Sequence, residues 1–252
     1  MPDRRSHRGP HPGDPERFGA SRLHTLRRAC ADLGWLLSGG YAANSSLKLV
    51  GDRHALDLRQ RQAVARASCA TTVAAARAAR LQSLGPLPEL HVDGFNVLTT
   101  IEAALAGGVV LGCADGCYRD VASVHGTWRH VVETPAAVEH LATLLAAAGV
   151  EQVVLLLDAP VGNSGRLASL VRELTEARGW PWRVEVVTDP DRELAQRDAV
   201  VATADSGILD QGVRWVNLAR EAVMKLPRAW LVDLGAPVSQ RGSANRSGTE
   251  VE

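Results

Sequence analysis

The chain has 252 residues, of which 46% are hydrophobic, and its formal net charge is zero. This length allows one α/β domain with an appendage or two small domains, with enough apolar residues for a sizeable core. No apolar run reaches the ~18 residues that a membrane span needs, and no secretory signal is evident near residue 1, so we expect a cytoplasmic protein with no membrane partner. Its 4 scattered cysteines favour reduced thiols over a disulfide framework.

Charge is distributed unevenly along the chain. Residues 1–80 hold 14 Lys and Arg against 6 Asp and Glu, whereas residues 81–252 hold 14 against 22. A basic first third joined to an acidic body is typical of a protein that binds an anionic partner with the former and cations with the latter. Alternatively, the two parts neutralise each other across their interface. The sequence does not decide between these interpretations.

The first part of the chain predicts a tail followed by a basic helical module over residues 21–84. Residues 1–20 are rich in Pro, Gly, Arg and His, which predicts disorder, and residues 239–252 form a second polar, disordered tail. Apolar residues at three- and four-residue steps predict helices over 21–37 and 44–50. Asp57 with Gln60 forms a capping-box pattern, which predicts one long helix from Leu58 to about Leu81.

Basic side chains of this module are candidates for nucleic-acid binding, namely Lys48, Arg59, Arg61 and Arg66. Helices that carry clustered arginines can dock on a phosphate backbone, so RNA is the expected partner. A small helical cap packed on the main domain is the alternative, because helix surfaces usually carry such charges. The sequence leaves open whether the chain forms a homo-oligomer.

Residues 89–235 predict an α/β domain that follows a Pro-rich linker. Strand-like and helix-like segments alternate here, which predicts a mostly parallel sheet with helices on both faces. The Asp115-Gly116 turn predicts a hairpin inserted into the first crossover. Main-sheet strands are expected at residues 89–93, 152–157, 183–187, 199–204 and 213–216, with an edge strand at 229–234.

Three of the expected strands end on an aspartate: Asp93, Asp158 and Asp205. Ligands of open parallel sheets bind beyond the carboxyl ends of the strands. Crowded carboxylates raise one another's pKa unless a cation neutralises them, and hard divalent cations bind such oxygen clusters. The pattern therefore predicts a Mg²⁺ or Mn²⁺ site for attack of water on a phosphodiester. Alternatively, each aspartate only caps the helix that follows it.

Two short motifs resemble those of known nucleases. The segment DGFNVL at residues 93–98 resembles the opening motif of the NYN branch of PIN-like ribonucleases, and ATADSGILD at residues 202–210 resembles a later motif of that superfamily. Residues 22–235 are also similar to the family called domain of unknown function 434. That family carries a basic helical segment, the first motif, and an insert that reads ADGCYRDV here, at residues 114–121.

The resemblance implies a PIN-like three-layer α/β/α domain with strand order 3-2-1-4-5 and a metal-dependent ribonuclease activity. Asp93 would be the first metal ligand, with Asn96 as its orienting neighbour. Asp205 would be the ligand after the fourth strand, and Asp210 an outer ligand. The pattern of aspartates at strand ends, more than the motifs, adds Asp158, which ends the second strand at the sheet edge beside Asp93.

Further residues are weaker candidates for the same site. NYN and PIN nucleases generally carry another acidic residue on the helix before the fourth strand, where Glu193 and Asp198 are the candidates. Asp115 and Asp120 of the insert, and Ser206, could complete the cluster. An ion pair with Arg119 is the alternative role for the two aspartates of the insert.

Two other functions stay open. A non-catalytic nucleic-acid-binding or adaptor protein on a degenerate nuclease fold would bind RNA in a salt-sensitive manner without cleaving it. A Rossmann-like enzyme, such as a nucleotide phosphohydrolase, is disfavoured because the chain lacks the glycine-rich dinucleotide and P-loop motifs.

Overall fold

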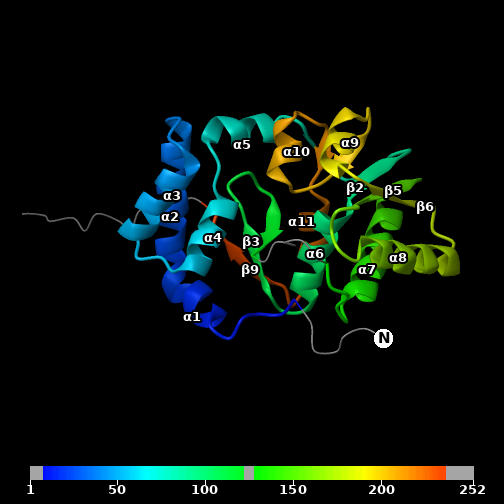
Figure 1. The fold of residues 1–252 in the computed structure, drawn as a ribbon, viewed down its shortest axis with the longest axis horizontal. Helices are drawn as coiled ribbons and strands as arrows, with labels where there is room; N and C mark the ends of the chain where they lie inside the picture. Colours follow the sequence, from blue (N-terminus) through cyan, green and yellow to red (C-terminus); the bar gives the residue numbers. More distant parts are fainter. Residues whose placement is uncertain (1–7, 122–127, 237–252) are drawn as a thin grey trace, which may run out of the picture.

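A computed structural model of the chain describes residues 8–121 and 128–236. Its helices are α1 (Asp14–Phe18), α2 (Ala20–Ser38), α3 (Ala43–Arg53), α4 (Leu58–Ala67), α5 (Thr71–Ala78), α6 (Gly94–Leu105), α7 (Thr134–Ala148), α8 (Ser164–Arg178), α9 (Pro190–Gln196), α10 (Ser206–Asp210) and α11 (Leu218–Met224). Its strands are β1 (Leu81–Gln82), β2 (Leu90–Asp93), β3 (Val109–Gly112), β4 (Tyr118–Asp120), β5 (Val153–Asp158), β6 (Trp182–Val187), β7 (Val200–Ala202), β8 (Trp215–Val216) and β9 (Trp230–Asp233). Figure 1 shows α1–α4 at one end of the molecule and the strands β2, β5 and β6 at the other.

The main sheet has six strands in the order β1-β8-β7-β2-β5-β6, and every neighbouring pair is parallel. One face packs on α6, α7, α8 and α11, and the other packs on α9 and α10. The central strands β2 and β5 are buried on both faces, which explains their apolar sequences. The predicted mixed α/β layered class and mostly parallel sheet are confirmed.

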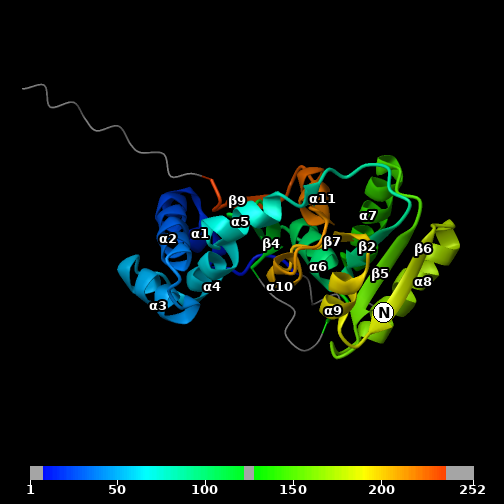
Figure 2. The same ribbon diagram turned by 90° about the horizontal axis from the view of Figure 1, so that it is seen from above.

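A second sheet of three strands, in the order β4-β3-β9, lies between the main sheet and the N-terminal helices (Figure 2). The predicted hairpin is confirmed as the antiparallel pair β3-β4. The edge strand expected at residues 229–234 was assigned to the wrong sheet, because β9 pairs in parallel with β3. Leu111 and Val232 of this small sheet share a hydrophobic core with Leu26 and Val64 of the helices, so the hairpin is the platform on which the module packs.

The expectation of disorder over residues 1–20 was wrong for α1. Phe18 is 3% exposed, and the buried carboxylate of Asp14 receives two hydrogen bonds from Arg59, at 2.6 and 2.9 Å. Burial of Phe18 and two ion pairs to α4 and its cap, Arg59–Asp14 and Arg17–Asp57, hold this segment, and its composition gave no sign of these contacts. The tail at residues 239–252 lies outside the described residues.

The long helix expected from Leu58 to about Leu81 is two helices. The capping box of Asp57 and Gln60 begins α4 as predicted. The chain then becomes extended at Ser68, and the main-chain carbonyl of Ala67 accepts a hydrogen bond from the amide of Ala114 at 2.8 Å. A contact with the β3-β4 turn, distant in sequence, therefore replaces helix continuation.

Ion pairs join the basic first part of the chain to the acidic body. They are Arg8–Glu102, Arg27–Asp233, Arg66–Asp120, Arg77–Asp115 and Arg77–Asp210. Neutralisation across the interface, one of the two interpretations of the charge pattern, thus occurs in the folded chain. In the described part of the chain, no helix is both long and apolar enough to cross a membrane. All four cysteines are free thiols.

Candidate functional site

Asp93 lies where β2 ends and α6 begins, at the carboxyl edge of the main sheet. The amide of Asn96 donates to its Oδ1 at 3.4 Å, so Asp93 caps α6, and the hydroxyl of Thr203 donates to its Oδ2 at 2.8 Å. Residue 94 must be glycine, because a Cβ there would stand 2.8 Å from the carbonyl oxygen of Leu156 on β5. This close approach holds the end of β2 against β5, the strand that delivers Asp158.

The two sequence motifs are connected by hydrogen bonds between the ends of β2 and β7. The side-chain oxygen of Asn96 accepts from the amide of Ala204 at 2.8 Å. Thr203 bonds both to Asp93 and to the amide of Asp205, the latter at 2.9 Å. Asn96 therefore positions the loop that carries Asp205, as well as lying beside Asp93.

The strand-end aspartates line a pocket of about 200 Å³. Five carboxylates contribute to it: Asp93, Asp120, Asp158, Asp191 and Asp205. Its other lining residues are Arg66, Phe95, Asn96, Thr99, Val161 and Pro190. The structure thus brings together Asp93, Asn96, Asp158 and Asp205, the four residues predicted to be catalytic, and adds Asp120 from the hairpin.

Carboxylates in this pocket are held in an environment that disfavours their charge. Burial raises the pKa of Asp93 to about 7, and repulsion from Asp205 and Asp191 adds to the effect. Burial also raises the pKa of Asp120, whose neighbour Arg66 offsets only part of it. For Asp158 and Asp191, burial and then neighbouring carboxylates raise the pKa in the same way.

Several polar atoms of the pocket have no partner. Oδ1 of Asp120 and Oδ1 of Asp158 are buried without a hydrogen bond, as is Nε of Arg66. Helix capping accounts for the hydrogen bonds of one oxygen of Asp93 and one of Asp205. The latter oxygen accepts hydrogen bonds from the amides of Gly207 and Ile208. Capping does not account for Asp158, because α8 begins only at Ser164. Within the described residues, no group of three or more His, Cys, Asp or Glu side chains that could hold a metal ion is found.

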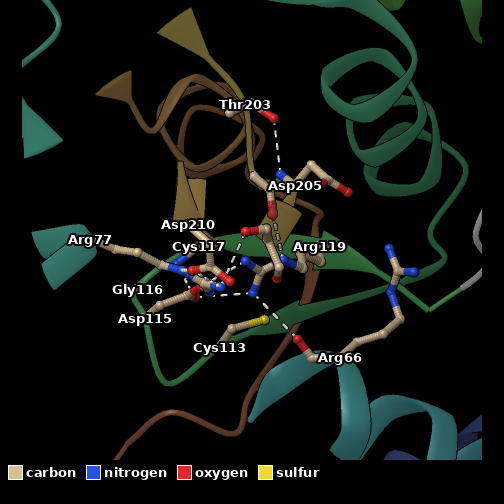
Figure 3. A network of polar contacts seen from close by, with 12 residues as sticks. Arg66, Arg77, Cys113, Asp115, Gly116, Cys117, Arg119, Thr203, Asp205 and Asp210 are labelled. Atoms are coloured by element: carbon tan, nitrogen blue, oxygen red, sulfur yellow. Dashed lines mark hydrogen bonds and ion pairs between the residues drawn. The ribbon is translucent and has the colours of Figure 1, made fainter. Parts of the chain in front are cut away.

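Asp115 and Asp210 belong to a different cluster, so their assignment to the metal site is corrected. Figure 3 shows that Arg77 contacts both carboxylates, with 2.5 Å from Nη1 to Asp115 and 2.7 Å from Nη2 to Asp210. Arg119 donates two hydrogen bonds to Asp115, at 3.0 and 2.7 Å. Ser206 is exposed and does not line the pocket; its carbonyl faces Arg77.

Three of the four basic residues predicted to bind nucleic acid are engaged within the helical module. Arg59 is bound to Asp14, and Arg61 and Lys48 both bind Asp52, at 2.8 and 3.0 Å. The bond to the buried Asp14 gives Arg59 a structural role, whereas nucleic-acid binding by Arg61 and Lys48, which make a local ion pair, stays a prediction. Arg66 alone among the four reaches the pocket.

Asp191 is the carboxylate of the pocket that the sequence analysis did not single out. The two candidates for an acidic residue on the helix before the fourth strand point elsewhere: Glu193 pairs with Arg197 at 3.3 Å and Asp198 with Arg214 at 2.7 Å. Asp189 caps α9, which turns Asp191 of its first turn toward the pocket. Ligands bind beyond the carboxyl ends of parallel strands, which is how the sequence identified Asp93. The same reasoning could have identified Asp191, because its segment directly follows β6.

The fold and the pocket define a mixed α/β protein with a carboxylate-lined site at the edge of a parallel sheet. The chain belongs to the family described as Domain of unknown function (DUF5616), whose model matches residues 87–221. A second model, Protein of unknown function (DUF434), matches residues 25–80, so the similarity to that family is found over the helical module and not over residues 22–235. An uncharacterised protein of Methanocaldococcus jannaschii is 29% identical over 208 residues, covering 81% of this chain and 99% of its own length. No solved structure matches the chain.

Proposed function

We propose that this protein is a metal-dependent nuclease that hydrolyses phosphodiester bonds of RNA in the carboxylate pocket. The observation that carries the proposal is the uncompensated acidity of that pocket. Five carboxylates converge there with one arginine, and Asp120 and Asp158 each keep a buried oxygen without a partner. Grouping carboxylates in this way, with some of their oxygens buried and unpartnered, costs free energy, and a bound cation relieves that cost.

A PIN-like core is part of the proposal, and the strand order supports it. With β2 counted as the first strand of the α/β body, β6-β5-β2-β7-β8 runs third, second, first, fourth, fifth along the sheet. That order equals the one implied by the resemblance to NYN proteins. The short strand β1 is an addition at the edge, contributed by the chain just after α5.

Mg²⁺ or Mn²⁺ fits the donors present. Mg²⁺ typically binds through one or two carboxylates and keeps several waters, so a closed cage of side chains is not required. We expect one or two of Asp93, Asp158 and Asp205 to contact the ion directly and the others to contact its waters, with Asp191 and Asp120 beside them. A divalent cation bound there activates water and neutralises charge on the phosphate. Asp210 is not included, because Arg77 binds it outside the pocket.

Two neighbouring groups position Asp93. Thr203 and the amide of Asn96 fix the orientation of its carboxylate. With a pKa of about 7, Asp93 holds or releases a proton near neutral pH. Cation binding and proton release at Asp93 are therefore coupled, and activity should rise with pH through this range.

A non-catalytic RNA-binding protein is the second candidate, favoured by the lack of a ready-made group of three ligands among the described residues. It predicts RNA binding that weakens with salt and no cation-dependent cleavage. A phosphohydrolase is the third candidate, and it predicts hydrolysis of mononucleotides in a parallel sample but no cleavage of RNA.

The test is incubation of the purified full chain with end-labelled single-stranded RNA and Mn²⁺, with EDTA in a parallel sample. Asp93→Asn should lower the cleavage rate at least about 100-fold, while RNA affinity and circular dichroism stay unchanged. The matched control is Glu173→Gln, an equal change of charge at an exposed position on α8. Cleavage that survives EDTA, or persists in Asp93→Asn, rejects the proposal. Hydrolysis of mononucleotides alone would select the phosphohydrolase.

A further inference from the structure

Arg66 is the only cation among the described residues that line the carboxylate pocket. It lies in the last turn of α4, so it belongs to the helical module, whereas the pocket aspartates all belong to the α/β body and its hairpin. A basic side chain has thus been brought from a separate part of the chain to an acidic site.

The main chain at Arg66 is fastened in place. Its carbonyl oxygen accepts a hydrogen bond from Nη1 of the buried Arg119 at 3.3 Å, as Figure 3 shows. The next carbonyl, of Ala67, accepts from the amide of Ala114 at 2.8 Å. Arg119 also donates to the carbonyl of Ala204 at 2.7 Å, directly before Asp205. The end of α4 and the loop that carries Asp205 are therefore held by the same guanidinium.

The side chain of Arg66, by contrast, is not satisfied. Its Nε is buried without a hydrogen-bond partner, and its contact with Oδ2 of Asp120 is 4.0 Å, too long for a hydrogen bond. Asp120 is 4% exposed, lines the same pocket and leaves its Oδ1 unpartnered. Arg59, on the same helix, makes two hydrogen bonds to Asp14.

An unsatisfied guanidinium next to a pocket of carboxylates has a specific chemical use. Its planar donors match two oxygens of a phosphate group. Five carboxylates alone would repel a phosphodiester, so binding of this anion needs positive charge on the protein side as well as a cation among the carboxylates. Arg66 is the described side chain that supplies it.

We propose that Arg66 binds the non-bridging oxygens of the phosphate that is attacked in the pocket, so that the helical module completes the site of the α/β body. This inference rests on the proposed nuclease function. It differs from a general role of the module in holding RNA, because it assigns one side chain to the reacting phosphate and leaves Arg59, Arg61 and Lys48 in their ion pairs.

The test compares two substrates, a single-stranded RNA and the minimal diester bis(p-nitrophenyl) phosphate, which has no flanking phosphates. Arg66→Ala should lower kcat/KM about 100-fold on both substrates in Mn²⁺, and Arg66→Lys should recover part of the loss. Arg28→Ala removes an equal charge at an exposed position on α2 and should stay within about twofold of wild type. Wild-type turnover of the small diester by Arg66→Ala would overturn the proposal. If Arg66→Ala does not fold, Arg66→Lys replaces it, and wild-type turnover of the small diester by Arg66→Lys would overturn the proposal.

A second readout separates this proposal from the nuclease function. The Nε–Hε resonance of Arg66, assigned by its loss in Arg66→Lys, should shift when inorganic phosphate or an oligonucleotide is added with Mg²⁺. A shift in a protein that cleaves nothing would sustain the phosphate site and reject the nuclease function. Cation-dependent cleavage with no shift, and no effect of Arg66→Ala, would reject the phosphate site and sustain the nuclease function.

Discussion

The carboxylate pocket and the cluster around Arg119 lie side by side, and both are built from aspartates that follow strands or turns. Burial by itself would raise the pKa of Asp115, but the two arginines beside it hold that pKa below its usual value. In the pocket, burial raises the pKa of Asp93 and Asp120, and one arginine at 4.0 Å does not reverse it. The difference shows that the supply of cationic partners, more than the number of acidic residues, separates a structural cluster from a candidate binding site.

The largest expected effect comes from removing the charge of the paired aspartate. Asp115→Asn leaves the buried Arg119 without its carboxylate and leaves Arg77 with Asp210 alone, so the free energy of unfolding should fall by about 3–5 kcal/mol. Urea unfolding followed by circular dichroism measures it. A loss as small as that of an exposed substitution would show that the two clusters do not differ in the way described.

Stability should depend on pH through Asp93. Its folded pKa of about 7 lies above the ordinary 3.8, so the folded state holds a proton that the unfolded state releases between these values. The stability from that proton is present below about pH 4 and is lost as pH rises through 7, at about 1.4 kcal/mol per unit. In EDTA, wild type should therefore lose stability from pH 5 to pH 8, and Asp93→Asn should lose less. Equal slopes in the two proteins would contradict the environment assigned to Asp93.

Divalent cations should stabilise the pocket and leave the ion-paired cluster unaffected. With Mg²⁺ or Mn²⁺ at about 100 times its dissociation constant, the gain is about 2.7 kcal/mol, seen as a higher Tm. Asp93→Asn should lose most of this gain, whereas Glu173→Gln should keep it. A gain that is the same in Asp93→Asn and in wild type would place the ion elsewhere.

The smallest effect is expected from neutralising Asp120, one oxygen of which has no hydrogen-bond partner. Asp120→Asn removes a buried charge that has no hydrogen bond to Oδ1, so in EDTA at pH 8 the protein should be more stable by on the order of 1 kcal/mol. The matched substitution Asp115→Asn has the opposite sign. If both variants lose stability equally, Asp120 has a structural partner in solution and is not part of an unsatisfied site.

The sequence was sufficient for the features that depend on local patterns. Periodicity and the aspartates that follow apolar runs predicted the parallel sheet and placed Asp93, Asp158 and Asp205 at one edge, because the carboxyl ends of parallel strands necessarily meet there. The DGFNVL motif also predicted Asn96 at the site, where its side chain accepts a bond from Ala204.

What the sequence could not supply depends on contacts between distant segments. Arg66 and Arg59 look alike on one helix, and only the fold decides that Arg59 meets Asp14 while Arg66 meets the pocket. Asp210 matches a motif position, yet Arg77, 133 residues away in sequence, binds it outside the pocket. The extended chain at Ser68 likewise follows from a bond to the hairpin turn, which no helix propensity encodes.

Gly94 has a consequence for how far the site can vary. A methyl group there would be 2.7 Å from a side-chain carbon of Leu157 and 2.8 Å from the carbonyl oxygen of Leu156, so any other residue forces the start of α6 away from β5. The carboxylates at the ends of the two strands would separate with it. The absence of a side chain at Gly94 therefore determines the spacing of the acidic groups. That spacing in turn limits the radius of any ion that they could share.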